Sequence, residues 1–246
     1  MKTTSLLRDY LNNLPPFLQH TYTIYEWPDL PDPWLQVQAP SVSEFIGRWW
    51  APIQHHLPQT VSRLQAQCDT ILAVEADGEP WALVYVLSLL PTNDYGFLFG
   101  YAPTTNPQLR FEVTQQGWLT PSGLADFYQV HNGIGEPLIP LVNGARELTL
   151  LSEHFPANER PFLDYEPTEL LEFAPDGGGN GQYFYKRLAD GRTVDWDHET
   201  RELSDEMPFW AFVDQRLSQL WSNSGKSSAE SASVNLLDLW DQEHGA

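Results

Sequence analysis

The residues best suited by type to chemistry lie together in one short stretch. Asp195, Asp197, His198 and Glu199 place carboxylates and an imidazole one or two residues apart, and such groups can share a divalent metal ion. In an extended strand, however, the side chains of Asp195 and Asp197 point to one face while that of His198 points to the other. This divergence favours a structural or recognition role, so we expect no bound metal.

Three histidines are further candidates for acid–base chemistry. His55 and His56 are neighbours, so on a helix they could not both face one pocket. His131 lies on an apolar stripe at the end of an expected helix, where a cationic ring would interact favourably with the helix dipole. Catalysis would require a hydrogen-bonded partner that the sequence does not reveal, and acidic pairs are too frequent here to identify a glycosidase dyad. We therefore expect no catalytic residues and no enzymatic activity.

A glycine-rich run, GGGNG at 177–181, is the last candidate. The backbone amides of such a loop bind phosphate when the loop opens a helix. Here an aromatic, strand-like run follows at 182–188, and the Lys-Ser or Lys-Thr of a phosphate-binding loop is absent. The pattern is therefore typical of a hairpin turn, with Gly178 and Gly179 as turn residues, and we expect no nucleotide and no other cofactor.

The elements that position these residues form one segment, 173–220. Its pattern predicts, after an apolar lead-in and the glycine turn, a strand at 182–188, a turn at Asp190-Gly191, a strand at 193–196 and a loop at 197–206. Pro208 then opens a helix with an apolar stripe made of Phe209, Phe212, Val213, Leu217 and Leu220. We expect a β-meander with this helix lying on it.

A second helix is expected upstream, beginning at Thr120-Pro121 and ending in FYQVHNG at 127–133, with Asn132 and Gly133 as a left-handed cap. The order of this helix, the glycine run, the Asp-Gly turn, the WDHE strand end and the MPFWAFV helix resembles the SUKH superfamily of bacterial immunity proteins and fungal cell-wall regulators. The resemblance covers roughly 118–220. It implies an α+β fold in which a mixed or antiparallel twisted sheet, a β-meander, is covered by helices.

The first hundred residues lie outside the resemblance, and their patterns predict further helices and a hairpin. In order, these are an amphipathic helix before Pro15-Pro16, an extended aromatic segment at 17–40, a helix after the capping pattern Ser41–Glu44, a helix after Pro58, a hairpin at 70–90 and a third strand at 95–101. The nearly continuous apolar run 81–90 indicates a central strand covered on both faces.

These patterns predict a single α+β body over 1–222. Residues 1–103 would form an N-terminal extension with helices and a hairpin, and 104–222 the SUKH-like core, with a turn cluster at 103–107 between them. One sheet shared across that turn cluster is equally compatible with the sequence. Serines from Ser222 onward predict a flexible tail, 223–246, whose short apolar segment would dock on this body or on another chain.

The charge balance limits the choice of partner. The chain has 13 Lys and Arg against 33 Asp and Glu, a net charge of -20. Such a surface repels nucleic acid and anionic membranes and attracts basic proteins. The single cysteine, Cys68, excludes an intramolecular disulfide framework, and we recognise neither a signal-peptide core nor a membrane-length apolar run. We therefore expect a cytoplasmic protein whose partner is basic, without nucleic acid or membrane as partners.

The resulting hypothesis is an acidic, non-catalytic protein-binding module. The SUKH resemblance implies an immunity protein that binds and neutralises a cognate toxin, possibly a nuclease; a housekeeping scaffold or regulator of endogenous partners is the alternative. The partner surface is expected on the acidic loop and the aromatic residues that bracket it. These residues are Trp196, Asp197, Glu199, Glu202, Asp205, Glu206 and Trp210. Asn132, Gly133, Gly178, Gly179 and Gly191 are expected as structural turn residues.

Overall fold

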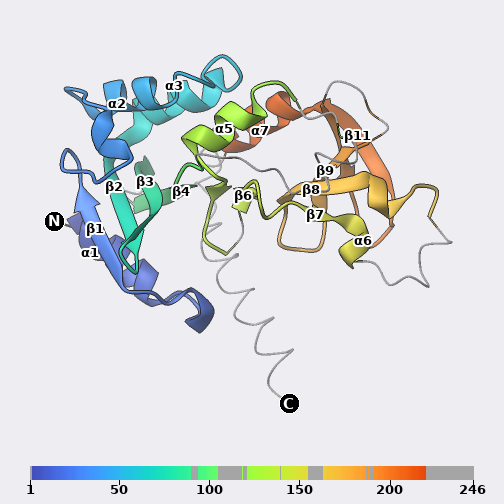
Figure 1. Ribbon diagram of the computed structural model, residues 1–246, viewed down its shortest axis with the longest axis horizontal. Coiled ribbons are helices and arrows are strands. Elements are labelled where there is room, and N and C mark those ends of the chain that lie inside the picture. Colours follow the sequence, from blue (N-terminus) through green and yellow to red (C-terminus); the bar gives the residue numbers. More distant parts are fainter. Residues whose placement is uncertain are drawn as a thin grey trace.

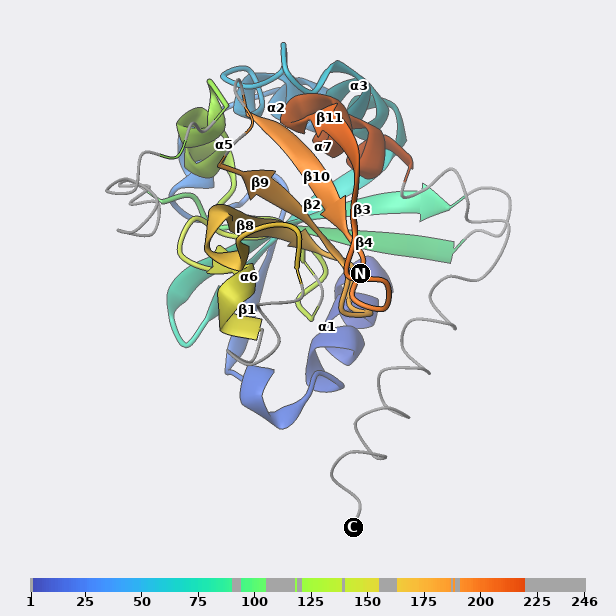
Figure 2. The ribbon, with the colours of Figure 1, turned by 90° about the vertical axis from the view of Figure 1, so that its right-hand side faces the viewer.

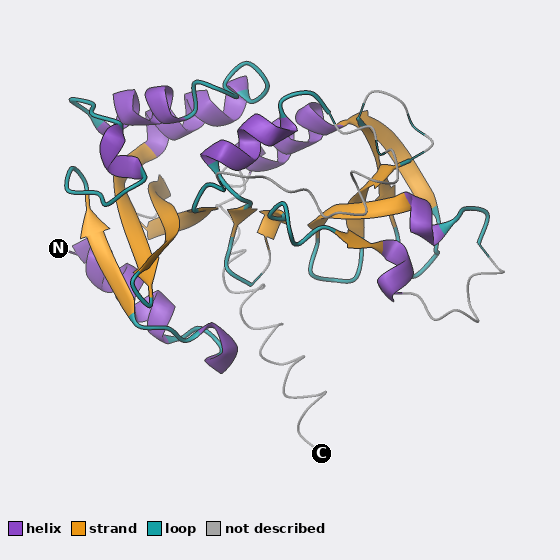
Figure 3. Ribbon diagram, in the orientation of Figure 1, coloured by secondary structure: helices purple, strands orange, loops and turns teal. Residues whose placement is uncertain are grey.

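The structure is a computed structural model that describes residues 2–89, 94–104, 118, 121–138, 140–154, 163–186, 188 and 191–219. The described residues form two antiparallel sheets and several helices (Figure 1), which confirms the α+β class. Helices α2, α3, α5 and α7 lie along one side of the molecule, above both sheets (Figure 3). None of the helices in the described ranges has the length and apolar character needed to cross a bilayer.

The bounds of these elements are as follows. The helices are α1 (Lys2–Asn12), α2 (Val42–Trp49), α3 (Pro58–Gln67), α5 (Leu124–Val130), α6 (Leu151–His154) and α7 (Phe209–Gln219), with 3-10 turns η1 (Pro16–Leu18), η2 (Trp34–Gln36) and η4 (Pro167–Glu169). The strands are β1 (Tyr22–Glu26), β2 (Cys68–Ala76), β3 (Glu79–Leu89), β4 (Asp94–Tyr101), β5 (Ile134–Gly135), β6 (Pro140–Val142), β7 (Thr149–Leu150), β8 (Leu170–Pro175), β9 (Gly181–Tyr185), β10 (Arg192–Trp196) and β11 (Leu203–Pro208).

The first sheet has the strand order β1-β2-β3-β4-β5-β6. Strand β3 pairs with β2 on one side and β4 on the other, and the side chains of 82–87 are all buried, which confirms the predicted central strand. One face of the sheet packs against α2 and α3, and the other against α1, whose Leu7 and Leu11 lie one helical turn apart and are fully buried. The extended segment 17–40 contributes β1 to the edge.

The second sheet has the order β11-β10-β9-β8-β7 and contains the predicted meander. Side chains alternate between its faces. On one face, Phe173 and Phe184 pack on Phe209 of α7, with ring centroids 4.9 and 5.2 Å from it. On the other face, Tyr183 and Trp196 pack under the segment that includes α6. Helix α7 therefore covers the sheet, as expected, but it begins at Phe209, because Pro208 is the last residue of β11.

The change from one sheet to the other does not fall at the expected turn cluster, 103–107. Strands β5 and β6 join the first sheet through the pairing of Phe99 with Gly135, so the segment 104–222 contributes strands to both sheets. The chain passes to the second sheet after Val142, where the Asn143 N–H donates to the Phe173 carbonyl at 2.7 Å. A continuous apolar core contains residues of both sheets, which makes the described residues one packed body.

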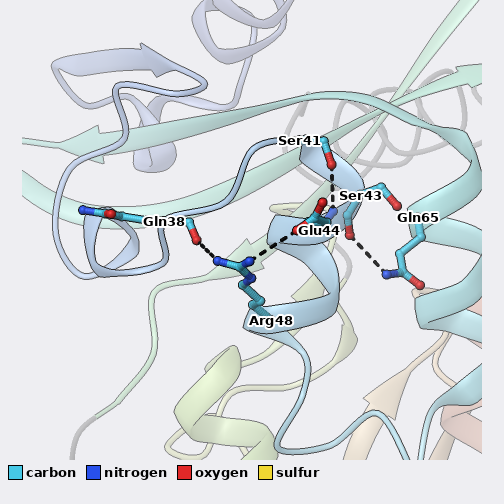
Figure 4. A network of polar contacts seen from close by, with 6 residues as sticks. All are labelled: Gln38, Ser41, Ser43, Glu44, Arg48 and Gln65. Atoms are coloured by element: carbon cyan, nitrogen blue, oxygen red, sulfur yellow. Dashed lines mark hydrogen bonds and ion pairs between the residues drawn. The ribbon is translucent and has the colours of Figure 1, made fainter.

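Helix α2 shows how a local sequence signal is used. The Ser41 hydroxyl accepts the Glu44 N–H at 3.2 Å, which confirms the predicted N-cap (Figure 4). The Glu44 carboxylate pairs with Arg48 at 3.3 Å, one turn along the helix, and Arg48 also donates to the Gln38 carbonyl. The Gln65 amide donates to the Ser43 carbonyl at 3.1 Å and so links α3 to α2.

Helix α3 is capped by a residue far away in the sequence. Its own N-cap residue, Leu57, has no side chain that can accept a hydrogen bond. Asp214 of α7 accepts the N–H groups of Gln59 at 3.2 Å and Thr60 at 2.8 Å, and the Thr60 hydroxyl at 2.8 Å. Asp214 is only 5% exposed. The two helices, side by side in Figures 1 and 2, are thus joined by a buried carboxylate at a helix N-terminus.

Three expected boundaries need correction. Helix α5 begins at Leu124 after Gly123, whose φ is 82°, rather than at Pro121; Thr120 lies outside the described residues. The loop expected at 197–206 ends at Glu202, because β11 takes up its second half as an edge strand. Of the predicted left-handed cap, Gly133 adopts the left-handed conformation with φ 96°, as expected, but Asn132 does not. The tail 223–246 lies outside the described residues.

Candidate functional site

The carboxylates of the predicted cluster are engaged in separate local contacts. Asp195 lies in β10 and accepts the Gln182 amide at 2.8 Å. Asp197 closes the turn that follows β10, since its Oδ1 accepts the N–H groups of Thr200 at 2.8 Å and Glu199 at 2.9 Å. The Thr200 N–H is the main cause that lowers the pKa of Asp197, so its negative charge is stabilised. Among the described residues, no group of three or more His, Cys, Asp or Glu is placed to hold a metal ion.

The glycine-rich run is the turn between β8 and β9, as predicted. Gly177 and Gly179 adopt φ angles of 80° and 98°, which other residues rarely adopt. His198 packs on this turn, because its backbone N–H and its ring Nδ1 both lie 2.8 Å from the Asn180 side-chain oxygen. A Cβ at Gly179 would lie 3.2 Å from the His198 ring. The glycine turn and the turn 197–200 therefore form one end of the second sheet.

The predicted partner surface is divided between two ends of the β10–β11 hairpin. Asp197, Glu199 and Glu202 lie at the end near β10's last residue, whereas Glu206 ion-pairs with Arg192 at 3.2 Å at the other end. Strand β10 has five residues, so these ends are about 14 Å apart. Asp205 belongs to β11, but its side chain lies outside the described residues. The acids therefore do not form the single rim expected from the sequence.

The two tryptophans are divided in the same way. Trp196 is 5% exposed, and its indole N–H donates to the Tyr165 hydroxyl inside the core of the second sheet. This burial corrects the expectation that Trp196 contacts a partner. Trp210 is half-buried at the start of α7, donates to the Ser122 carbonyl at 2.9 Å, and stacks on the His56 ring at 4.4 Å. It is far from the turn 197–200 and cannot bracket the same surface.

A cavity of about 300 Å³ opens between the second sheet and α7. It is lined by Gln182, Asp195, Met207, Phe212, Gln215, Arg216 and Gln219. The Arg216 guanidinium lies 5.6 Å from the Phe212 ring centroid. Burial lowers the pKa of Arg216, and the negative charges of Asp176 and Asp195 partly oppose this lowering. The lining residues that the structure describes offer amides, one carboxylate and one cation, and none of them carries a hydroxyl, thiol or imidazole. Its chemistry suits hydrogen-bonded recognition.

His131 belongs to a buried polar network that the sequence did not reveal. The Trp50 indole N–H donates to the Tyr85 hydroxyl at 2.7 Å, and that hydroxyl lies 2.8 Å from His131 Nε2. His131 Nδ1 lies 3.3 Å from the Tyr101 carbonyl, which can only accept, so Nδ1 carries the proton and Nε2 accepts from Tyr85. His131 is 0% exposed, and burial lowers its pKa to about 3. The expected cationic ring is therefore wrong: the histidine is neutral and structural.

Gly100 is the sequence feature that could have indicated this network. A glycine inside a strand often marks a close approach of another group. In β4, a Cβ at Gly100 would overlap the His131 ring.

His55 and His56 also differ from the expectation. They lie in a turn segment, 51–56, rather than on a helix, and their ring centroids are 3.9 Å apart. Partial burial and then the neighbouring His55 lower the pKa of His56. Because the His56 ring lies flat on Trp210, with 13° between the ring planes, this pair helps to join the turn to α7. We assign it no catalytic role.

Comparisons with known proteins identify no relative: no family, no curated protein and no solved structure matches this chain.

Proposed function

We propose that this chain is a non-catalytic, acidic module that binds a basic protein. The observation that supports this most directly is the net charge of -20, which accelerates association with a basic partner and opposes binding to nucleic acid. The SUKH resemblance extends the proposal to an immunity protein that neutralises a cognate toxin, because a nuclease toxin needs a basic surface for its own substrate. A scaffold for endogenous partners remains the alternative from another class.

The structure refines which residues we propose for partner contact. Glu199 and Glu202 are exposed on the turn after β10, and Asp197 organises that turn through its bonds to Glu199 and Thr200. A turn that is fixed before binding loses little conformational entropy when a partner docks. We therefore propose the acidic contact on 197–202, and we omit Trp196 and Trp210 from this surface.

The test begins with affinity capture from the native cell extract at low and high salt. One tight partner that is released by salt supports toxin neutralisation, whereas several weak partners support a scaffold. Association kinetics are then measured with the recovered protein and the Glu199→Lys, Glu202→Lys variant, whose net charge changes by 4 from the -20 of the natural chain. Slower association with a reduced salt dependence is expected, because exposed charges act mainly on the encounter rate.

A matched control carries the same charge change elsewhere. Asp9 in α1 and Asp29 after β1 are also exposed, so the Asp9→Lys, Asp29→Lys variant has the same net charge. If both variants slow association equally, only the total charge matters and the turn is not the contact. If neither variant changes the rate, the acidic character of the chain does not drive binding.

A further inference from the structure

A second cavity, of about 420 Å³, lies on the first sheet and has a different character from the one beside α7. It is lined by Leu18, Pro80, Trp81, Tyr101, Ala102, Asn132, Pro137, Pro140 and Glu147. Most of these residues belong to β3, β4 and the β5–β6 hairpin, which are consecutive in the sheet (Figure 1). We call it the aromatic groove. Two aromatic rings, several prolines and one carboxylate form its walls.

A β-bulge turns Trp81 toward this groove. Strand β3 pairs Ala82 with Val74 and Pro80 with Glu75, so Trp81 is the extra residue of the bulge. Its ring is half-buried and lies 5.3 Å from the Tyr22 ring and 6.0 Å from the Tyr101 ring. Bulges commonly redirect a side chain where a surface is used for binding. The aromatic rings support each other and still line an open cavity.

The carboxylate of the groove is held in place by its own turn. Glu147 Oε2 accepts the Gly144 N–H at 3.1 Å, and the Glu147 N–H donates to the Gly144 carbonyl at 3.0 Å, while the side chain remains exposed. Burial raises the pKa of the Tyr101 phenol, and the charges of Glu147 and Glu136 raise it further. The potential along this wall is therefore negative. Among the described residues, no Lys, Arg or His lines the groove, and Arg146, beside Glu147 in the sequence, is not one of its lining residues.

We propose that the aromatic groove holds a lysine or arginine side chain of the basic partner. The aliphatic stem would pack on Trp81, Tyr101 and the prolines, and the cation would lie near the aromatic faces and the Glu147 carboxylate. Aromatic rings attract cations through their quadrupole, and a fixed carboxylate adds charge attraction without first being ordered. The inference rests on the proposed function, which supplies a basic partner, but it assigns binding to a different face from the turn 197–202.

The volume and the charge of the groove favour this occupant over a neutral one. A cavity of about 420 Å³ lies within the range of about 300–1,000 Å³ that is typical of ligand pockets. A neutral proline-rich segment would also fit the aromatic walls, but it would leave the Glu147 carboxylate without a cation. The choice between the two occupants is therefore a question of charge and can be tested by charge alone.

The probes are a hexa-arginine peptide and a hexa-citrulline peptide, which has nearly the same shape without the charge. In the natural chain and the Glu147→Gln variant, binding is located by NMR through the indole N–H signal of Trp81. Affinities of all variants, including Trp81→Leu, are measured by titration calorimetry. Glu147→Gln keeps the size of the side chain and an oxygen for the Gly144 N–H, so the fold should survive. We expect it to weaken hexa-arginine binding about 3-fold, and Trp81→Leu to weaken it about 5-fold. Glu199→Gln removes a carboxylate from the other proposed contact, the turn 197–202. Asp29→Asn, an exposed residue outside both surfaces, is the matched control for a lost carboxylate.

The outcomes separate the groove from the proposed function. Hexa-citrulline binding as tightly as hexa-arginine would overturn the basic occupant. Hexa-arginine binding that falls with Glu199→Gln but is unchanged by Glu147→Gln would refute the groove and leave the acidic module standing. If the natural chain binds no hexa-arginine at all, both proposals lose their charge basis. If circular dichroism shows that Trp81→Leu unfolds the chain, the Glu147→Gln titration decides.

Discussion

The Tyr85 hydroxyl provides the most direct test of how the first sheet is stabilised. It accepts a hydrogen bond from the indole N–H of Trp50, the residue that follows α2, and donates one to His131, the residue that follows α5. All three side chains are 0% exposed, so water cannot replace either bond. Tyr85→Phe removes one oxygen atom, keeps the ring in the core, and leaves an indole N–H and an imidazole nitrogen without partners.

The expected cost follows from these two orphaned groups. A buried polar group without a partner costs about 1–3 kcal/mol, and part of this is offset because the hydroxyl itself no longer has to be buried. We therefore expect Tyr85→Phe to lower the free energy of unfolding by about 3 kcal/mol. Urea unfolding at neutral pH, followed by tryptophan fluorescence and circular dichroism, would show a lower midpoint with an unchanged slope.

The matched control is Tyr25→Phe in β1. The Tyr25 hydroxyl donates to Glu75 at 2.7 Å, but both residues are only half-buried and water can replace the bond. This variant should change the unfolding midpoint much less. If Tyr85→Phe costs no more than Tyr25→Phe, the buried chain of hydrogen bonds does not stabilise the fold and our reasoning is refuted.

Three further predictions follow from the same structure. Burial lowers the pKa of His131 to about 3, so between about pH 6.5 and 3 the unfolded chain binds more protons than the folded chain. The free energy of unfolding should therefore fall by up to about 1.4 kcal/mol per pH unit as the pH drops through this range. Urea unfolding at a series of pH values, with and without His131→Phe, would contradict this if the natural chain and the variant lose stability with the same slope. Gly100→Ala should destabilise the chain by about 1–3 kcal/mol, because a Cβ would overlap the His131 ring; an unchanged thermal midpoint would be inconsistent with the packing. Deletion of 223–246 should leave the melting temperature of the body nearly unchanged, and a fall of tens of degrees would show that the tail belongs to the core.

The elements that the sequence predicted well are those with a strong local period. Leu7 and Leu11 repeat at the helical spacing and are buried in α1, and the apolar run of β3 is covered on both faces. Strand β11 was missed because Asp205 and Glu206 have low β propensity. An edge strand accepts such charges, since only one side of it pairs and charge discourages further pairing.

The candidate site was harder to predict, because long-range contacts decide which face of a strand is covered. Period two places Trp196 on the same face as Val194, but it does not say that Tyr165 and α6 cover that face. The distance between Trp196 and Trp210 depends on β11 pairing back along β10, which separates residues that are close in sequence. The aromatic groove depends on a bulge at Trp81 and on strands β5 and β6, which no local pattern located.

The cap on α3 also bears on the order in which the chain can acquire its structure during synthesis. The carboxylate of Asp214 follows Thr60 by 154 residues, so the ribosome makes the helix long before it makes the group that satisfies its first amides. At about 5–20 residues per second, α3 waits several seconds or more for that partner. Until then its first turn must be satisfied by water, and a nascent chain stopped before Asp214 should show rapid hydrogen exchange at the Gln59 and Thr60 amides.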